Sequence, residues 1–251
     1  MCNFYGHKVA KMDFIRLNNI ELKLGYFAAI KELQELINGF SYGNAPIVLK
    51  KNESSYEVVP MHWEFIPIWI KTMEQVQNAR RQGIPWLNAT SEKLLESKMF
   101  RDAALKRRCL VIASHFFEWR SFKAEGTRKE IKYPYCIELK NKDHFFMAGI
   151  WQPFTDIETG ETIDTFAIVT TKANALMEQV HNGKKRMPVI FTDELAIKWL
   201  SEDLTEAQIK NISSFQYPAS EMNAFTIEKN FKTSLNPLEA FYFEELPKLK
   251  I

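Results

Sequence analysis

The sequence has few cysteines, no apolar leader and no long apolar run. Its 251 residues contain three cysteines, Cys2, Cys109 and Cys136, which are too few and too scattered for a disulfide framework. No Cys-x-x-Cys pair indicates a zinc site, so we infer no metal and no organic cofactor. No segment reaches the length of a membrane span, and charged residues occupy the place of a signal sequence. These absences favour a cytoplasmic protein with reduced thiols and no membrane contact.

The excess of one charge sign is also small. The 33 Lys and Arg residues nearly balance 31 Asp and Glu residues, which leaves a formal net charge of +2. Bulk charge therefore does not indicate a nucleic-acid-binding protein, and any basic face must be local. What the chain has in quantity is apolar side chains, at 46%, with 19 Phe, 8 Tyr and 6 Trp. This content is enough for a sizeable core.

Hydrophobic periodicity predicts short helices mixed with short strands. Helices are expected over 26–40, with Gly39 as C-cap, over 91–108, with Ser91 as N-cap, over 172–180, and twice after residue 192. Thr205 and Gln208 have the spacing of a capping box in the last of these. Strands are expected over 56–70, 109–119, 133–139, 144–154, 164–171 and 186–192, with 133–139 paired to 144–154 around the turn Asn141–Asp143. No regular βαβ order is visible, which favours one α+β domain over 1–251, or about 2–250 without Met1, with mainly antiparallel strands.

Cys2 stands directly behind the initiator methionine. Loss of Met1, which small second residues permit, would give Cys2 both a thiol and a free α-amine. The pKa of an α-amine is about 8 and that of a cysteine thiol about 8.5, so part of the amine is neutral near pH 7. The amine can form a Schiff base with an aldehyde, and the thiol can then close a five-membered thiazolidine on the same carbon. Alone, a cysteine at this position is more often an incidental small residue at a frayed end, so the functional interpretation needs partner residues elsewhere in the chain.

Three internal residues are candidate partners of Cys2. Asn88 precedes the helix expected over 91–108, and it also fits an ordinary turn or cap residue. His181 follows a helix, where a surface histidine is favoured by the helix dipole. Glu118 lies in an apolar strand between Phe117 and Trp119, so it either faces solvent by strand alternation or is partly buried and active in proton transfer.

These stretches, in this order, resemble the SOS-response-associated peptidase (SRAP) family, which includes the human 5-hydroxymethylcytosine-binding, embryonic-stem-cell-specific protein. The residues that carry the resemblance are Cys2, the Asn44-Ala45-Pro46 motif, Trp63, Pro67 and Trp69, Asn88, the Arg108-Cys109-Leu110 strand ending in Glu118-Trp119, and His181 ahead of Arg186-Met187-Pro188. The resemblance spans nearly the whole chain. It implies a curved or barrel-like sheet flanked by short helices.

The resemblance also implies a function. Family members cross-link to abasic sites in single-stranded DNA through a thiazolidine at the N-terminal cysteine, and they remove their own initiator methionine. By this resemblance Cys2, Asn88, Glu118 and His181 are the catalytic residues. Glu118 moves the proton of the Cys2 amine, His181 serves the sugar oxygens and Asn88 orients the amino terminus or the sugar. Acid–base partners are needed because only the ring-opened sugar presents an aldehyde.

DNA contacts are expected outside this group. Pro46 and Trp69 match apolar positions near the bases that flank the lesion, whereas Trp63 is expected in the core. Thr90 stands where the family usually has a phosphate-binding arginine, which removes a charge from that position. Phosphate contacts are expected from Arg186 and from the other basic residues near the motifs, namely Arg80, Arg81, Lys184 and Lys185.

Two other functions remain open at this point. An N-terminal-nucleophile amidohydrolase would use the Cys2 thiol on an amide substrate. A non-catalytic single-stranded nucleic-acid binder would use the aromatic and basic segments alone and would bind with a steep salt dependence. The abasic-site interpretation predicts a monomeric cytoplasmic protein, associated with the nucleoid if the source is bacterial.

Overall fold

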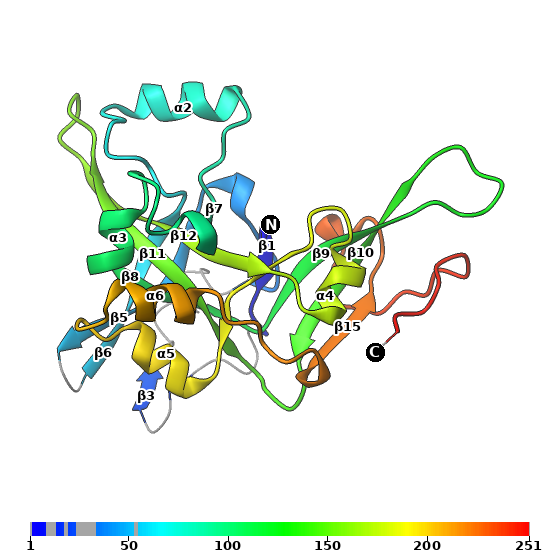
Figure 1. Ribbon diagram of the computed structural model, residues 1–251. Helices are drawn as coiled ribbons and strands as arrows, with labels where there is room; N and C mark the ends of the chain where they lie inside the picture. The colour runs from blue at the N-terminus through cyan, green and yellow to red at the C-terminus, as the bar shows by residue number, and fades with distance from the viewer. Residues whose placement is uncertain (1, 9–13, 18–19, 24–33, 53–54, 251) are drawn as a thin grey trace.

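Five strands close into a barrel because β12 pairs with strands at both ends of the series (Figure 1). The computed structural model describes residues 2–8, 14–17, 20–23, 34–52 and 55–250. The barrel strands are β5 (Asn44–Asn52), β6 (Ser55–Trp63), β8 (Arg108–Ala113), β11 (Phe145–Thr155) and β12 (Thr162–Lys172). Their order is β12-β6-β5-β8-β11 and back to β12, and only the β12–β6 pairing is parallel. Three short strands extend this sheet: β7 (Asn88–Thr90), β13 (Arg186–Pro188) and β14 (Ile190–Phe191).

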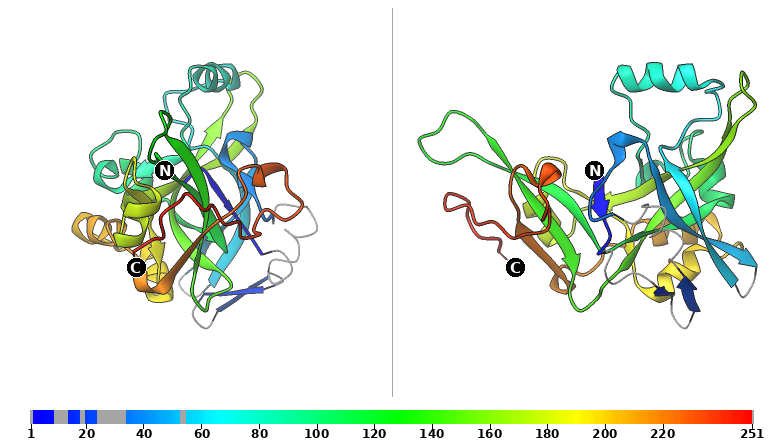
Figure 2. Two further views of the ribbon diagram at one scale, coloured as in Figure 1. Left: turned by 90° about the vertical axis from the view of Figure 1, so that its right-hand side faces the viewer. Right: turned by 180° about the vertical axis from the view of Figure 1, so that it is seen from behind.

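A second sheet lies beside the barrel and contains the beginning of the chain. Its order is β15-β10-β9-β1-β4, and all of its pairings are antiparallel. The strands are β1 (Phe4–Gly6), β4 (Ile37–Asn38), β9 (His115–Phe122), β10 (Ile131–Leu139) and β15 (Met222–Thr226). The connection between β9 and β10 projects beyond the rest of the sheet (Figure 2). A separate pair consists of β2 (Phe14–Leu17) and β3 (Ile20–Lys23).

Short helices cover the outside of the barrel. The α-helices are α2 (Met73–Arg81), α3 (Arg101–Lys106), α4 (Ala175–Val180), α5 (Asp193–Trp199) and α6 (Glu206–Ser213), and the 3-10 helices are η2 (Gly39–Ser41), η3 (Ser91–Lys93), η4 (Ala219–Glu221) and η5 (Phe231–Thr233). Helices α3 and α5 pack on β8 and β11, whereas α4 packs on β9 and β13. The buried Arg108 guanidinium ties α3 to α5, because it donates hydrogen bonds to the carbonyl oxygens of Ala104 and Trp199.

Strand β8 separates two apolar clusters, and this explains its nearly unbroken apolar sequence. Cys109 and Val111 belong to the cluster that also contains Cys2 and Trp63. Leu110 and Ile112 belong to the cluster formed with the helices. Successive residues of a strand face opposite sides, so a strand that is buried on both faces has no position for a polar residue.

The predicted fold class is confirmed: the chain is an α+β protein with a mainly antiparallel, barrel-like sheet and short helices. The strand at 164–171 and the capping box of Thr205 and Gln208 are confirmed as well. Trp63 is buried as predicted. Its indole nitrogen donates to the Leu87 carbonyl at 3.0 Å, and its ring stacks on Phe166.

Two helix predictions are wrong in the described residues. The helix expected over 26–40 falls partly outside them, and its described end forms β4 and η2, so Gly39 is the first residue of a 3-10 turn and not a C-cap. In the segment 91–108 only Arg101–Lys106 is α-helical, and Ser91 lies within η3, whose N-cap is Thr90. Tertiary packing overrides the helical periodicity in both segments.

The strand predictions err mainly in pairing and in length. Strands β10 and β11 do not pair with each other: β10 lies between β9 and β15, whereas β11 lies in the barrel. The segment 109–119 is two strands divided at Ser114, one in each sheet. The segment 186–192 is divided at Val189 into β13 and β14, which both belong to the barrel sheet. The segment 56–70 is extended only to Trp63. A break of one residue lets a chain leave one sheet for another, and local composition does not reveal it.

Gly6 offers a test of how tightly β1 is held. A Cβ at Gly6 would overlap the Glu35 carbonyl oxygen and lie 2.6 Å from His115 Nε2. We expect Gly6→Ala to destabilise the protein by about 1–3 kcal/mol through overpacking, which lowers the melting temperature by about 2–4 °C per kcal/mol. Gly43→Ala is the control, since a Cβ there meets no atom within 4 Å. Thermal unfolding of both variants checks this, and equal melting temperatures would contradict it.

Candidate active site

The start of the chain is fixed between two strands of the second sheet. Strand β1 pairs with β9 through Tyr5 and Gly6, and with β4 through Phe4 and Tyr5. The amide of Gly39 donates to the Asn3 carbonyl at 2.9 Å, which extends this pairing toward Cys2. Figure 1 shows β1 at the centre of the molecule, between the barrel and strands β9 and β10. The first residues are therefore held inside the fold.

Cys2 is completely buried and lies close to Glu118. Its thiol contacts the Phe4 carbonyl oxygen at 3.8 Å. Burial raises the pKa of the Cys2 thiol well above its usual range, and the charge of Glu118 raises it further. The thiol is therefore protonated near neutral pH.

Glu118 is buried, which decides between the two orientations that the sequence left open. The residue is 3% exposed, and it shares a face of β9 with Phe116, which belongs to the central apolar cluster. Phe117 belongs to a cluster on the opposite face. Burial raises the pKa of Glu118 to about 7. Glu118 is therefore a carboxyl group that exchanges its proton near physiological pH.

His181 lies across from Glu118 at the end of α4. Its Nδ1 is 2.8 Å from the Arg186 carbonyl oxygen and 3.5 Å from Oε1 of Glu118. A carbonyl oxygen only accepts, so Nδ1 carries the hydrogen and Nε2 of the neutral ring keeps its lone pair. Burial lowers the pKa of His181 to about 4. Near pH 7 the His181 ring is neutral, so its contact with Glu118 is not an ion pair.

Asn182 fixes His181 relative to β9. Its side chain accepts a hydrogen bond from the Ser121 amide at 2.9 Å and donates one to the Ser121 carbonyl oxygen at 2.7 Å. Ser121 is three residues from Glu118 on the same strand. This two-way clamp holds the turn after α4 against the strand that carries the carboxyl group.

Asn88 contacts the residue that follows Cys2. Its Nδ2 donates to Oδ1 of Asn3 at 2.9 Å, and β7 attaches it to β12 opposite Ile168. The Asn88 Oδ1 atom is buried and has no hydrogen-bond partner among the described residues. Asn88 thus joins the barrel to the beginning of the chain and keeps one acceptor for a ligand.

A cavity of about 680 Å³ adjoins these groups, although Cys2 and Asn88 are not among the residues that line it. Glu118 and His181 form part of its wall with Asn3, which Asn88 holds. The remaining lining residues are Phe4, Asn38, Phe40, Trp119, Ser121, Lys132, Gly183, Lys184 and Lys232. The four residues expected to be catalytic from the sequence are thus close together, from β9, from the end of α4, from β7 and from the start of the chain.

The residues expected to bind DNA are placed less uniformly. Trp69 is 54% exposed, and Thr90 is partly exposed at the end of β7. Pro46 is buried in β5 opposite Pro60, and its contact with a DNA base stays a prediction. Its position in the middle of a β-sheet explains the burial.

The Arg186 guanidinium forms hydrogen bonds within the protein. Its guanidinium donates to Oε1 of Glu92 at 2.6 Å and to the Thr170 carbonyl oxygen at 2.6 Å. The pKa of Glu92 is lowered by this hydrogen bond, so the pair is charged and largely self-neutralising. Arg80 is similarly engaged by Glu64, whose side chain is fully buried.

Sequence reasoning missed Lys132, Lys232, Asn3 and Trp119 as cavity residues. No local motif distinguishes Lys232, which comes from η5, far along the chain. Strand alternation places Trp119 with Phe117 on the face of β9 opposite Glu118, so alternation does not reveal Trp119 as a cavity residue. In the described residues, no group of three or more His, Cys, Asp or Glu side chains is arranged to hold a metal ion. No helix in the described part of the chain is long and apolar enough to cross a membrane.

The fold is a barrel-like α+β fold in which the buried Cys2, at the start of the chain, lies near the Glu118 carboxyl group, which in turn contacts the His181 ring. These features together indicate the class of protein to which the chain belongs. The family model for SOS response associated peptidase (SRAP) matches residues 1–234, and the chain belongs to this family. The abasic site processing protein YoqW of Bacillus subtilis is 29% identical over 220 residues, which cover 81% of this chain and 91% of that protein. HMCES of Xenopus tropicalis, also named an abasic site processing protein, is 24% identical over 226 residues, covering 81% of this chain and 64% of that protein.

The fold likeness extends to solved structures. A crystal structure of a Bacteroides thetaiotaomicron protein superposes with a TM-score of 0.75 at 30% identity, and covers 95% of this chain and 97% of that one. The resemblance drawn from the motifs is therefore confirmed at the level of family and fold.

The raised pKa of Glu118 predicts a pH-dependent stability. A carboxyl group with a folded pKa of about 7 and an unfolded pKa of about 4.3 binds its proton more tightly when folded. Its contribution is fully present below about pH 4 and is lost as the pH rises through about 7. We expect Glu118→Gln to gain stability relative to the wild type across this window, by about 4 kcal/mol at pH 8.

Denaturant unfolding of both proteins between pH 4 and pH 8 measures this difference. Glu92→Gln is the matched control, because Arg186 lowers the pKa of Glu92 and its neutralisation should weaken the protein as the pH rises. A constant difference between Glu118→Gln and the wild type over the whole range would contradict a raised pKa for Glu118.

Proposed function

We propose that this protein captures abasic sites in single-stranded DNA by forming a covalent bond through Cys2 after removal of Met1. Two of its relatives carry the name abasic site processing protein. The observation that carries the proposal is the buried Glu118 carboxyl group, with a pKa of about 7, beside the buried Cys2. A proton-active carboxyl group next to a cysteine at the start of the chain suits amine and thiol addition to an aldehyde.

The proposed reaction has two bond-forming steps and no redox change. The Cys2 α-amine attacks the aldehyde carbon of the ring-opened abasic sugar, and loss of one water molecule gives an imine. The thiol sulfur then adds to the same carbon, while the thiol proton goes to the imine nitrogen. The product is a thiazolidine that joins protein and DNA. Because the pKa of the Cys2 thiol is raised, the amine is the first nucleophile and the thiol is the second.

Three side chains serve this sequence. Glu118 accepts the proton of the Cys2 ammonium group and returns it to the leaving water, since its pKa of about 7 allows both directions. His181, neutral at pH 7, takes the proton of the C1′ hydroxyl at Nε2 and delivers it to the ring oxygen as the C1′–O4′ bond breaks, which opens the sugar. Asn88 holds Asn3, and through it the position of Cys2.

Removal of Met1 precedes this chemistry. Hydrolysis of the Met1–Cys2 peptide bond consumes one water molecule and exposes the α-amine of Cys2. We assign this step to the protein itself, with Cys2 as the nucleophile and Glu118 as the proton carrier. The same buried residues then serve both cleavage and capture.

The DNA strand is proposed to run across the mouth of the cavity. Trp69 is exposed and available for base stacking, which contributes roughly 1–3 kcal/mol per base. The Thr90 hydroxyl group offers a hydrogen bond to a phosphate without adding charge. An amidohydrolase is less well supported, because the relatives reported above are named abasic site processing proteins and neither is named an amidohydrolase.

The first test is covalent capture on a denaturing gel. We expect the wild-type protein to form a slow-migrating adduct with a single-stranded oligonucleotide that contains one abasic site, and Cys2→Ala to form none that survives denaturation. Cys136→Ala is the matched control, since Cys136 is also buried but is internal, and it should still cross-link. Intact mass spectrometry should show the loss of one methionine from the wild type and from Cys136→Ala. Absence of an adduct with the wild type, or an undiminished adduct with Cys2→Ala, rejects the proposal.

The order of the two steps gives an independent prediction. Cys2→Ala cannot remove Met1 by the proposed route, so the variant is first treated with a methionine aminopeptidase and its mass is checked. It then has a free α-amine and should still form an imine that sodium cyanoborohydride reduces to a stable amine. We therefore expect a band with this variant only when the reductant is present. An oligonucleotide carrying tetrahydrofuran in place of the abasic sugar has no aldehyde and should give no band. If reduction traps nothing with Cys2→Ala, the amine is not the first nucleophile.

A further inference from the structure

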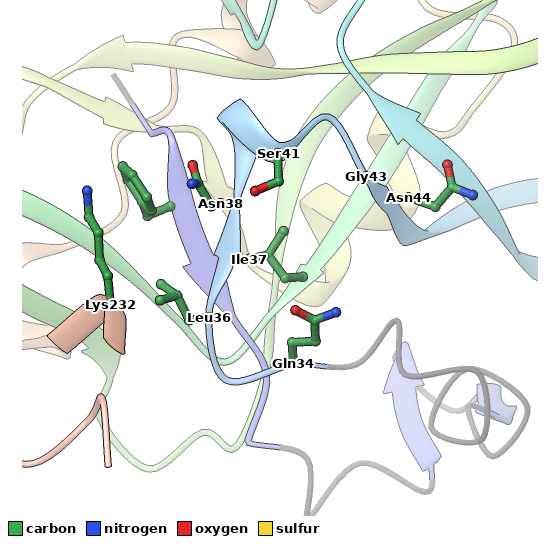
Figure 3. Close-up of a pocket in the computed structure, with 9 residues that line it drawn as sticks. Gln34, Leu36, Ile37, Asn38, Ser41, Gly43, Asn44 and Lys232 are labelled. Carbon is green, nitrogen blue, oxygen red and sulfur yellow. The ribbon is translucent and has the colours of Figure 1, made fainter. Parts of the chain in front are cut away.

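A second cavity of about 320 Å³ adjoins the active-site cavity. The two share Phe4, Asn38 and Lys232. We call the second one the flanking cavity; its other lining residues are Gln34, Leu36, Ile37, Ser41, Gly43 and Asn44. Figure 3 shows Lys232 and Leu36 on one side, with Ser41 above Ile37 and Gln34 below it. A ligand that extends beyond the active-site cavity past Phe4 would enter this space.

The lining of the flanking cavity combines apolar surface with amide and hydroxyl groups. Leu36 and Ile37 give apolar area, whereas Gln34, Ser41 and Asn44 give donors and acceptors. The Asn38 Oδ1 atom accepts from the Phe40 amide at 3.0 Å, so its NH₂ group is the part left to bind a ligand. A flat heterocycle with hydrogen-bonding edges matches this lining, and a nucleobase is such a group.

Lys232 supplies a cation at the boundary of the two cavities. Its Nζ lies 4.1 Å from the centroid of the Phe4 ring and 5.3 Å from that of Trp119. The neighbouring Phe231 stacks on Phe117 at 4.9 Å, which fixes η5 on β9. Among the described residues Lys232 forms no ion pair with a carboxylate. Aromatic faces hold the ammonium group in place while leaving its charge for a ligand.

We propose that the flanking cavity binds the nucleotide adjacent to the abasic residue, with its base among Gln34, Asn38 and Ser41, and that Lys232 binds the phosphate between the two nucleotides. This rests on the proposed function. An abasic residue has no base of its own to stack, so affinity must come from its neighbours. The spacing suits this assignment, because Lys232 lies where the strand would pass from one cavity to the other.

A variant that fills the flanking cavity tests the proposal. Gly43 lies on the cavity wall, and a Cβ added there meets no atom within 4 Å, so Gly43→Phe is expected to fold. The probe is a fluorescent single strand with one tetrahydrofuran residue, whose binding involves no covalent step. A second strand also lacks the base immediately 5′ of the tetrahydrofuran residue, and a third strand lacks the base immediately 3′ of it. Gly43→Ala is the control for the backbone change, and thermal unfolding confirms that each variant is folded.

The effect of Gly43→Phe on binding should depend on whether the DNA strand carries the base next to the tetrahydrofuran residue. Gly43→Phe should bind the first strand about tenfold more weakly than Gly43→Ala does. On the strand that lacks the base on one side, and on that strand only, the two variants should bind alike. Equal loss on all three strands, or no loss on any, overturns the proposal. Because the probe cannot cross-link, this outcome is separate from failure of covalent capture by Cys2.

Lys232 is tested by the dependence of binding on salt. Lys232→Gln should reduce the slope of log K against log salt by about 0.7 on single strands, the value for one lost phosphate contact. Lys140→Gln, which removes an exposed lysine at the far end of β10, is the matched control and should leave the slope unchanged. An unchanged slope with Lys232→Gln would show that Lys232 does not bind phosphate.

Discussion

The whole site depends on the insertion of three residues, Phe4–Gly6, between β4 and β9. This short pairing determines where Cys2 lies, because only one residue separates it from β1. Gly6 is required there, since the Glu35 backbone occupies the space of a Cβ. Chain ends fray unless they are tied into a sheet. In this protein the sheet that binds the chain start also carries Glu118, so anchoring and chemistry share one strand.

Burial shifts the pKa values of Glu118 and His181 in opposite directions. It raises the pKa of Glu118 to about 7 and lowers the pKa of His181 to about 4, and both changes favour the neutral form. A surface pair of these residues would carry opposite charges at pH 7 and would form an ion pair. The buried pair instead offers a proton on one side and a lone pair on the other. The raised pKa of Glu118 reduces the stability of the folded protein as the pH rises.

The sequence reveals the chemistry of the site better than its architecture. Cys2, Asn88, Glu118 and His181 stand out because each is a reactive or polar residue in a short motif, and the structure brings all four together. The pairing partners of β10 and the strand break at Ser114 are not visible, because they depend on contacts between distant segments. Pro46 illustrates the same limit, since its burial depends on its β6 partner, Pro60. Lys232 approaches the site only through folding of the last third of the chain.

Positive charge at the cavity comes from several segments and not from one motif. Thr90 carries no charge where the family usually has arginine, and the charge of Arg186 is matched by Glu92. Lysines 132, 184 and 232 line the cavity from β10, from the turn after α4 and from η5. An ammonium group acts as a point charge and imposes no bidentate geometry on a phosphate. In the proposed function, a DNA strand held by such point charges could shift along the cavity, so its register would be set by the contacts of its bases and by the proposed covalent bond at Cys2.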